Sequence, residues 1–358
     1  MIDERLLLRF LPSTSHRKTS LILLLHLCAL DSMATNSSAT APYADEWLAF
    51  EQMTGGRFVL QGSIADWRQQ FDGLFGQLKS MLPPPDNEVT VGDSSTPEGI
   101  KLRSYRPNHP DWQKLPIGLY IHSGGWCLGS IDHEDHLCRQ LVTSVPCQLM
   151  SVEYRLAPEH PYPAALDDCV AAYKHMVETL QATLNHRTKT FIVGGSAGGH
   201  LTLATALRLI EEGYTPRPSA IYALCPSTCM IPAVEKLSED LREYKRPDAY
   251  GDAAFLSNEV IAAAEAAFSG ETSPDEPYLS PLFHRRLDQL PLTYVTTSNK
   301  DPLHDDANML HHKLEQLGVA NTLKQYDGYA HFFHMLPMLE ASQRFMADLA
   351  QSMRDHVF

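Results

Sequence analysis

Strand-like runs separated by polar loops recur through residues 88–358. They occupy residues 119–121, 190–193, 292–297 and 322–326. The first of these runs is apolar throughout and is interpreted as a buried strand. A helix-like run at residues 201–207 follows the second of these strands. The alternation of strands and helices favours an α/β fold.

A different periodicity precedes the sheet and indicates an amphipathic helix. Apolar residues recur there at steps of mostly three and four: Ile64, Trp67, Phe71, Leu74, Phe75, Leu78 and Met81. The helix must end before the prolines that begin at Pro83. We expect it to pack on its own protein; a lipid-facing or partner-facing role is the alternative, which its few basic residues disfavour. Two further short helices are predicted at residues 253–256 and 260–264, before the late strands.

Composition narrows the range of partners. The chain has 358 residues, 44% of them hydrophobic, which is enough for one large core. Its formal net charge is −14, from 29 Lys and Arg against 43 Asp and Glu. A basic stripe that could release counterions is missing, which argues against nucleic acid and against an anionic membrane surface as partners.

The cysteines and histidines predict neither a disulfide framework nor a metal centre. Seven cysteines at irregular spacing fit reduced thiols. Cys225 and Cys229 lack a second ligand pair that would complete a structural zinc site. The segment 133–136 contains two histidines without the helical spacing of a zinc protease, and it is interpreted as a solvated helix start. We therefore expect no metal and no organic cofactor.

The first residues suggest a separate segment. A basic flank at 16–18 precedes an apolar run over 21–30, which loosely resembles a signal peptide but is too short to cross a bilayer. The alternative, which the thiol-rich body favours, is that Met33 is the true start and that the chain is cytoplasmic rather than secreted. We expect residues 1–39 to form an N-terminal extension.

The segment Gly194-Gly195-Ser196-Ala197-Gly198 lies between a predicted strand and a predicted helix. This is the context that a G-x-S-x-G nucleophile needs, because the serine must stand on a sharp turn beside a general base and oxyanion donors. The alternative is a glycine-rich turn with a buried serine. Ser196 is the candidate nucleophile, and the N–H of Ala197 is a candidate oxyanion donor.

A second glycine segment follows the strand at 119–121. His122, Ser123, Gly124 and Gly125 have the form of the loop that offers backbone N–H groups to an oxyanion in lipases and esterases. Gly124 and Gly125 are therefore assigned to the oxyanion hole together with Ala197. An ordinary Gly-Gly turn is the alternative.

The acid and base are expected after the nucleophile, in the chain order Ser, Asp, His. Asp301 follows the predicted strand at 292–297, and His331 follows the one at 322–326. His331 would take the proton from the serine, and Asp301 would orient the imidazole and stabilise the imidazolium. Asp305 and His334 lie close enough in sequence to be the alternatives.

These motifs, together with the stretch Tyr154-Arg155-Leu156-Ala157-Pro158-Glu159 that continues to Ala165, resemble the hormone-sensitive-lipase-like family of α/β-hydrolases. The resemblance spans about residues 88–358. It implies an α/β-hydrolase fold of the esterase or lipase type, with a mostly parallel central sheet flanked by helices and with a helical cap, to which residues 40–87 and an insertion at about 227–277 would contribute. It also implies that the Tyr-Arg-Leu-Ala-Pro-Glu stretch is a brace, in which Arg155 would pair with Glu153 or Glu159 beneath the site. His122 would support the glycine loop.

Two positions depart from the family pattern. Ser123 stands where the family's first glycine usually is, which could narrow the freedom of the loop. Gly195 stands where an acidic residue commonly precedes the nucleophile, so a negative charge beside the site is missing. Neither change removes a catalytic group.

The sequence thus predicts a serine carboxylester hydrolase that cleaves short- to medium-chain acyl esters of apolar alcohols, such as acetylated secondary metabolites, through an acyl-enzyme. An amidase, a dehydratase-type lyase and a non-hydrolytic ligand-binding receptor on the same fold are the alternatives, and the complete triad disfavours the receptor. The expected partner is a small-molecule ester, and the expected state is a monomer or homodimer.

Overall fold

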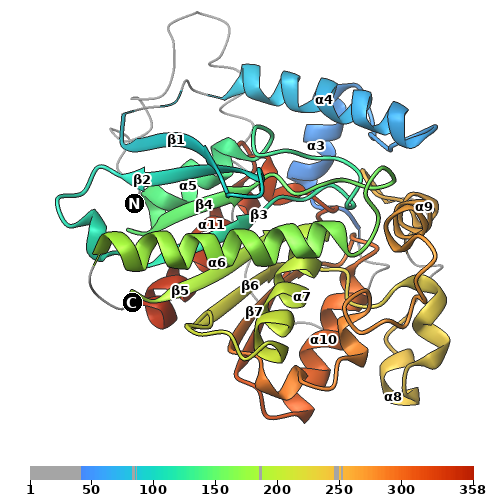
Figure 1. The fold of residues 1–358 in the computed structure, drawn as a ribbon. Coiled ribbons are helices and arrows are strands. Elements are labelled where there is room, and N and C mark those ends of the chain that lie inside the picture. The colour runs from blue at the N-terminus through green and yellow to red at the C-terminus, as the bar shows by residue number, and fades with distance from the viewer. Residues whose placement is uncertain (1–41, 83–84, 86, 185–187, 246–249, 251–252) are drawn as a thin grey trace, which may run out of the picture. The chain divides into compact units, whose positions relative to one another are not determined.

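A twisted sheet forms the centre of the protein (Figure 1). The computed structural model describes residues 42–358 apart from 83–84, 86, 185–187, 246–249 and 251–252. In that part of the chain the strand order is β1-β2-β4-β3-β5-β6-β7-β8. The strands are β1 (Val89–Ser95), β2 (Lys101–Pro107), β3 (Ile117–Ile121), β4 (Gln148–Val152), β5 (Thr190–Gly195), β6 (Ala220–Leu224), β7 (Leu292–Ser298) and β8 (Asn321–Tyr326).

Six neighbouring strands of this sheet run parallel to one another: β4, β3, β5, β6, β7 and β8. β2 is antiparallel to both of its neighbours, β1 and β4. The strand-like runs noted in the sequence all lie within strands β3, β5, β7 and β8. The prediction of a mostly parallel α/β sheet is therefore confirmed.

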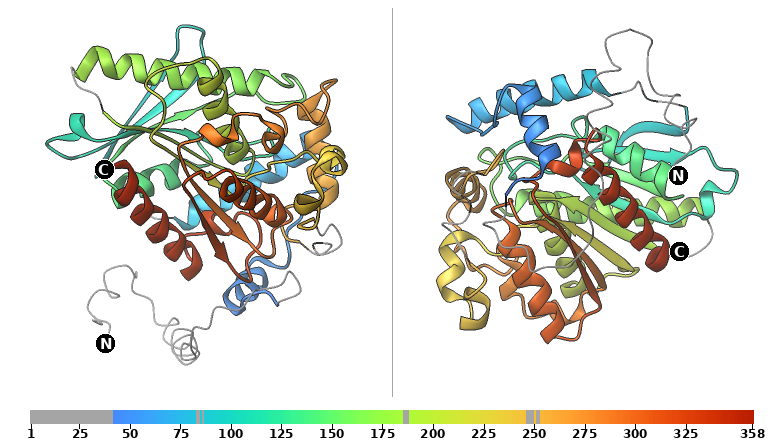
Figure 2. Two further views of the ribbon diagram at one scale, coloured as in Figure 1. Left: turned by 90° about the horizontal axis from the view of Figure 1, so that it is seen from below. Right: turned by 180° about the vertical axis from the view of Figure 1, so that it is seen from behind.

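Helices cover both faces of the sheet, and this explains the unbroken apolar strands. They are α3 (Asp45–Thr54), α4 (Ile64–Met81), α5 (Asp135–Ser144), α6 (Ala164–Leu184), α7 (Ala197–Glu211), α8 (Glu239–Arg242), α9 (Asn258–Ser269), α10 (His304–Gln316) and α11 (Glu340–Val357). Helices α6, α7 and α10 lie on one face, and α5 and α11 on the other (Figures 1 and 2). Leu119 and Ile121 enter the first of two cores, whereas Tyr120 between them enters the second.

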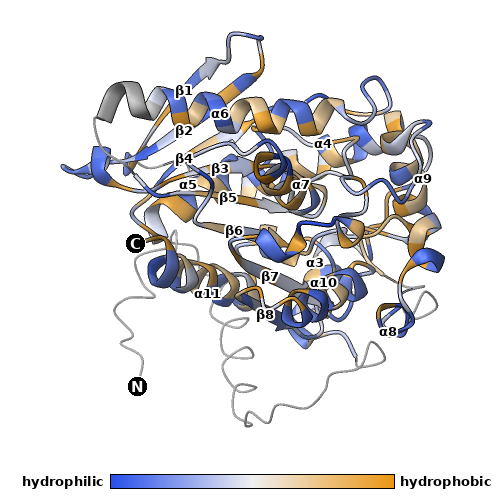
Figure 3. Cartoon of the chain, turned by 60° about the horizontal axis from the view of Figure 1, so that its bottom comes forward, coloured by the Kyte–Doolittle hydropathy of each residue, from blue (hydrophilic) through white to orange (hydrophobic). Residues whose placement is uncertain are grey.

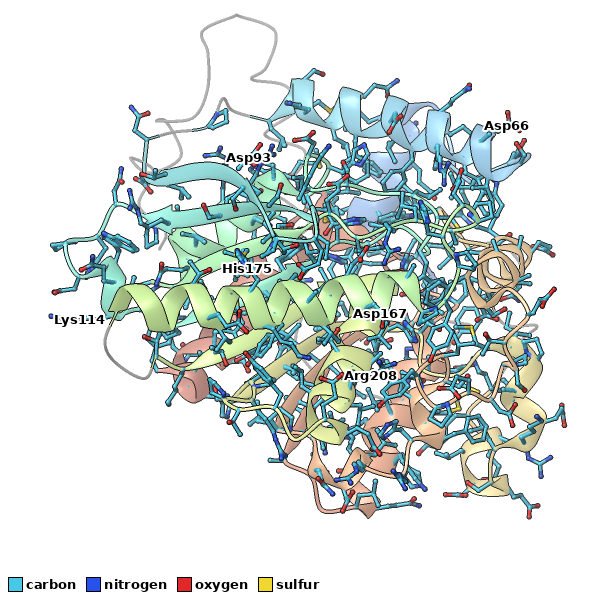
Figure 4. The ribbon with its side chains drawn as sticks, in the orientation of Figure 1. Asp66, Asp93, Lys114, Asp167, His175 and Arg208 are labelled. Atoms are coloured by element: carbon cyan, nitrogen blue, oxygen red, sulfur yellow. The ribbon has the colours of Figure 1, made fainter. Side chains whose placement is uncertain are left out.

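Helix α7 lies closest to the centre of the sheet. It contacts both β5 and β6, and nearly all of its residues are buried, which Figure 3 shows as a mainly hydrophobic ribbon. On its outer side Arg208 Nη1 lies 3.7 Å from Asp167 Oδ1 of α6 (Figure 4). The nucleophile candidate is therefore carried on the most completely buried helix–strand junction of the fold.

The amphipathic helix predicted before the sheet is α4, and its limits agree with the sequence. Ser63 caps it, accepting a hydrogen bond from the Asp66 N–H while the Asp66 carboxylate accepts from the Ser63 N–H. The helix ends at Met81, before Pro83. The helix predicted at 260–264 lies within α9, but the one predicted at 253–256 is wrong. There the chain bends at Ala254, and Phe255 has a positive φ of 66° and forms an isolated bridge with Val59.

No helix in the described part of the chain is long and apolar enough to cross a membrane. The predicted N-terminal extension, residues 1–39, lies outside the described residues. The cysteines that are described are all free and buried: Cys127, Cys138, Cys147, Cys169, Cys225 and Cys229.

Candidate active site

Ser196, His331 and Asp301 meet at the carboxyl ends of β5, β8 and β7. His331 Nε2 lies 2.9 Å from Ser196 Oγ, and His331 Nδ1 lies 2.6 Å from Asp301 Oδ2. The other Asp301 oxygen accepts the Leu303 N–H at 2.8 Å. All three side chains are buried. This geometry lets the imidazole accept a proton from the hydroxyl while the carboxylate holds its other nitrogen.

A strained turn presents the serine. Ser196 has φ 56° and ψ −120°, and its N–H donates to Leu224 O at 2.7 Å. The turn closes only because two neighbouring residues have no side chain: a Cβ on Gly194 would lie 2.5 Å from Gly198 O, and one on Gly198 would lie 2.1 Å from Ile121 O. Holding a non-glycine residue in this backbone region costs about 1–3 kcal/mol, a strain found mainly at functional sites.

The glycine loop stands opposite the serine. Gly124, Gly125 and Trp126 all have positive φ, at 123°, 57° and 59°. Gly124, Gly125 and Ala197 line the same small cavity as Ser196. A run of left-handed backbone turns its amide groups to one side, which suits an anion.

Two histidines outside the triad hold this loop. The Trp126 indole N–H donates to His200 Nδ1 at 3.1 Å, and His200 Nε2 bonds Tyr278 O at 2.9 Å. His122 Nδ1 bonds Ser123 O at 2.8 Å, and its ring stacks on Tyr154. Burial lowers the pKa of each imidazole to about 4, so both rings are neutral at physiological pH.

The two departures from the family pattern, Ser123 and Gly195, lie against each other. A Cβ on Gly195 would lie 2.8 Å from Ser123 Oγ, so the absent side chain makes room for the added hydroxymethyl group. The Ser123 N–H donates to Glu134 Oε1 at 2.8 Å, and Tyr120 OH donates to the other oxygen. The helix start predicted at 133–136 is confirmed, because α5 begins at Asp135, but Glu134 is not solvated: it is 2% exposed. Glu134 is a buried anchor for the glycine loop.

The alternative acid and base have other surroundings. Asp305 accepts from Tyr250 OH at 3.0 Å, and Asp306 accepts from the backbone N–H groups of Thr228 and Cys229 and from Lys245. His334 is buried, and its Nδ1 has no hydrogen-bond partner among the described residues. The structure brings together Ser196, Asp301 and His331, not Asp305 or His334.

The predicted partners of Arg155 are wrong. Its guanidinium forms a forked pair with Asp168, with Nη2 2.8 Å from Oδ1 and Nε 2.9 Å from Oδ2. Glu159 instead binds the Arg68 guanidinium of α4 through both oxygens, at 2.8 and 2.7 Å. Because Asp168 lies one helical turn into α6, spacing along the brace could not identify it. The brace therefore fixes α6 through Arg155 and α4 through Glu159.

Apolar side chains enclose the cavity above the serine. The cavity measures about 50 Å³. Its apolar walls come from the segment before the sheet and from the insertion before β7: Phe58, Leu60, Trp67, Phe71, Phe255, Leu256, Val260, Ile261 and Ala264. Both segments expected from the sequence to wall the site thus contribute to one cavity.

Cys225 lies behind the triad. Its sulfur and the ligand-type atoms of Asp301 and His331 all lie within 4.8 Å of one another. Asp301 and His331 are already hydrogen-bonded to each other, and burial raises the pKa of the Cys225 thiol well above its usual range. A neutral thiol is a poor metal ligand, so this grouping fits a packed triad better than a metal centre.

Comparison with known proteins identifies the family. A family model described as the alpha/beta hydrolase fold matches residues 118–335. The chain belongs to the α/β-hydrolase family. It is 35% identical over 325 residues to the versiconal hemiacetal acetate esterase of Aspergillus parasiticus, covering 87% of this chain and 98% of that one.

Other relatives agree with this assignment. The α/β-hydrolase is 28% identical over 302 residues to an ethyl acetate hydrolase of Pseudomonas putida, covering 81% of this chain and 89% of that one. A hyperthermophilic esterase from the archaeon Pyrobaculum calidifontis superposes with a TM-score of 0.75 at 27% identity, over 88% and 99% of the two chains. The chain is thus a carboxylester hydrolase, and its assignment as a hormone-sensitive-lipase-like α/β-hydrolase is confirmed.

Several supporting residues were missed by the sequence reasoning. Glu134, His200 and Phe268 each hold the glycine loop, Phe268 by stacking on Trp126 with ring centroids 4.7 Å apart. The position of His200, one helical turn after Ser196, was a usable signal, because its side chain must lie near the elbow. Glu134 and Phe268 gave none, since their contacts depend on tertiary structure.

Proposed function

We propose that Ser196 attacks the ester carbonyl and that His331, oriented by Asp301, accepts its proton and returns it to the leaving alcohol. The N–H groups of Gly124, Gly125 and Ala197 stabilise the oxyanion of the tetrahedral intermediate. Water, activated by the same imidazole, then releases the acid from the acyl-enzyme. The observation that supports these roles is the continuous hydrogen-bonded line from Asp301 through His331 to Ser196.

The substrate that this site favours carries a short acyl group, acetyl above all, on an apolar alcohol. A cavity of about 50 Å³ with apolar walls fits a group of a few carbon atoms. Two of the relatives are named for acetate esters, and one of these esters is a secondary metabolite. An acetylated secondary metabolite is therefore our proposed natural substrate.

The proposed compartment is the cytoplasm. Six buried free thiols in the described residues suit a reducing environment, in which a disulfide would not form. Mass spectrometry after alkylation of the unfolded protein, purified without reductant from its native cells, would count these thiols. Disulfide-linked pairs among them would contradict this proposal.

The experiment that tests the function combines turnover with labelling. Purified protein is assayed on p-nitrophenyl esters from acetate upward, and a fluorophosphonate label is mapped by peptide mass. We expect acetate to be the best substrate and Ser196 to carry the label. Ser196→Ala should lose turnover by about 10⁶-fold, with unchanged circular dichroism. Wild-type rates in that variant would disprove the mechanism, and labelling without ester turnover would favour the amidase or lyase alternatives.

A further inference from the structure

A second and much larger cavity lies beside the active site. It is a groove of about 970 Å³ between α4, the β1–β2 edge of the sheet, α5 and the segment after His331. Apolar side chains, including Phe75 and Leu137, form part of its wall. Arg103 holds part of its rim in ion pairs with Asp93 (Figure 4) and Asp132, at 2.7 and 2.6 Å.

One layer of aromatic rings separates this groove from the cavity at Ser196. Phe71 and Phe332 line the cavity, and their ring centroids lie 5.9 Å apart. Phe71 also contacts Phe75 and His133, at 4.5 and 5.2 Å between centroids, and both of those side chains line the groove. We call Phe71 and Phe332 the aromatic partition.

The partition borders the leaving-group side of the reaction. The Phe332 ring contacts the ring of His331 edge-on, with centroids 4.9 Å apart. In ester hydrolysis the base protonates the departing alkoxide, so the alcohol half of the substrate must lie beside this imidazole. A group that extends past Phe332 from that position enters the groove.

Phe332 is also held in a strained backbone conformation. It has φ 69° and ψ 0°, a region that bulky residues rarely adopt. Its contacts with Phe71, Phe255 and His334 hold the ring in place. Strain of this kind is typical of segments that move during function, because release of the ring also releases the backbone.

We propose that the groove is the alcohol subsite of the enzyme, and that the aromatic partition opens to admit it. The ligand is a bulky aromatic alcohol with hydroxyl substituents, whose rings lie against Phe75 and His133 and whose hydroxyl groups bond the charged rim. This inference rests on the proposed esterase function. It reconciles an acyl cavity of about 50 Å³ with a large alcohol, for which the groove of about 970 Å³ has room.

Two glycines on α4 provide a matched test. Gly76 lines the groove and Gly73 does not, and a Cβ at either position would meet nothing within 4 Å. Acetate esters of ethanol, phenol and 1-naphthol are assayed by pH-stat with wild type, Gly76→Trp and Gly73→Trp. We expect Gly76→Trp to lower the ratio of kcat/KM for naphthyl acetate to that for ethyl acetate about tenfold, because its indole fills the groove. Gly73→Trp should keep the wild-type ratio.

A second variant tests the partition. Phe332→Gly removes the ring and suits the positive φ, so we expect it to raise the same ratio about tenfold. Unchanged ratios in both Gly76→Trp and Phe332→Gly would overturn the inference, as would a Phe332→Gly enzyme that gains activity on longer acyl chains instead. A wild type that hydrolyses no ester and takes no label at Ser196 would disprove the esterase function itself.

Discussion

Asp301 and Asp306 are both buried carboxylates at the start of α10, yet their charges are balanced by different means. Asp301 accepts one backbone N–H and the imidazole of His331, a partner that can gain or lose a proton. Asp306 accepts two backbone N–H groups and the ammonium group of Lys245, a fixed cation. The first pair reaches a cavity through Ser196, whereas the second joins the insertion before β7 to α10.

The two carboxylates are therefore expected to serve two different requirements of the enzyme, turnover and stability. A carboxylate that faces an imidazole stabilises a charge that appears only during the reaction, so its effect falls on turnover. A carboxylate that faces a lysine neutralises a charge that is always present, so its effect falls on the free energy of unfolding. We therefore predict that Asp301 affects turnover and that Asp306 affects stability, although both carboxylates are almost fully buried.

The largest effect is predicted for a substitution at Asp301. Asp301→Asn should lower kcat about 10⁴-fold, because the amide favours the wrong imidazole tautomer while the packing stays intact. Asp306→Asn is the matched control and should change kcat far less. Steady-state kinetics with p-nitrophenyl acetate, beside circular dichroism of both variants, would measure this. Equal losses of kcat in the two folded variants would contradict the division of roles.

The second prediction removes Lys245, the cation that pairs with Asp306. Lys245→Met leaves Asp306 buried opposite an apolar side chain, and we expect the free energy of unfolding to fall by about 3 kcal/mol. Urea unfolding followed by tryptophan fluorescence would give the value. Lys245→Arg, which keeps the charge, should recover part of the loss. A Lys245→Met enzyme as stable as wild type would show that the backbone N–H groups alone satisfy Asp306.

Glu265 of α9 is a third buried carboxyl group, and its predicted effect on stability depends on pH. Burial raises the pKa of its carboxyl from 4.5 to about 8, so the folded protein holds a proton that the unfolded chain releases. The free energy of unfolding should therefore fall as pH rises from about 4.5 to about 8, by at most about 1.4 kcal/mol per pH unit from this group. Glu265→Gln should show a shallower fall when unfolding is measured at several pH values. Identical slopes would exclude Glu265 as the source.

The smallest expected effect concerns Cys225. Burial raises the pKa of its thiol, so iodoacetamide should leave the native enzyme fully active at neutral pH. Peptide mass mapping after an hour should find this cysteine unmodified, whereas the urea-unfolded chain serves as the reactive control. Rapid alkylation of Cys225 with loss of activity would mean that the space behind Asp301 opens in solution.

The fold and the motif positions were predictable because they follow from local rules. Strand-like runs located β3, β5, β7 and β8, and the spacing of apolar residues located α4, because both patterns can be read from the sequence alone. The family and the hydrolase class are confirmed by the relatives. The assignments of Ser196, Asp301 and His331 stay predictions about catalysis until variants are measured.

What could not be predicted depends on contacts between distant segments. Arg155 pairs with Asp168, and Glu159 with Arg68, because α6 and α4 pack beside the brace. The segment 253–256 is not helical, because Phe255 has a positive φ, bridges to Val59 and lines the cavity. In each case a tertiary contact overrode the preference of the local sequence.

The shared space of Ser123 and Gly195 makes the two positions depend on each other. A Cβ at 195 would lie 2.8 Å from the Ser123 hydroxyl oxygen, so that hydroxyl would have to shift to accept any side chain there. The effect of a substitution at 195 therefore depends on the residue at 123, and the effects of changes at the two positions should not simply add.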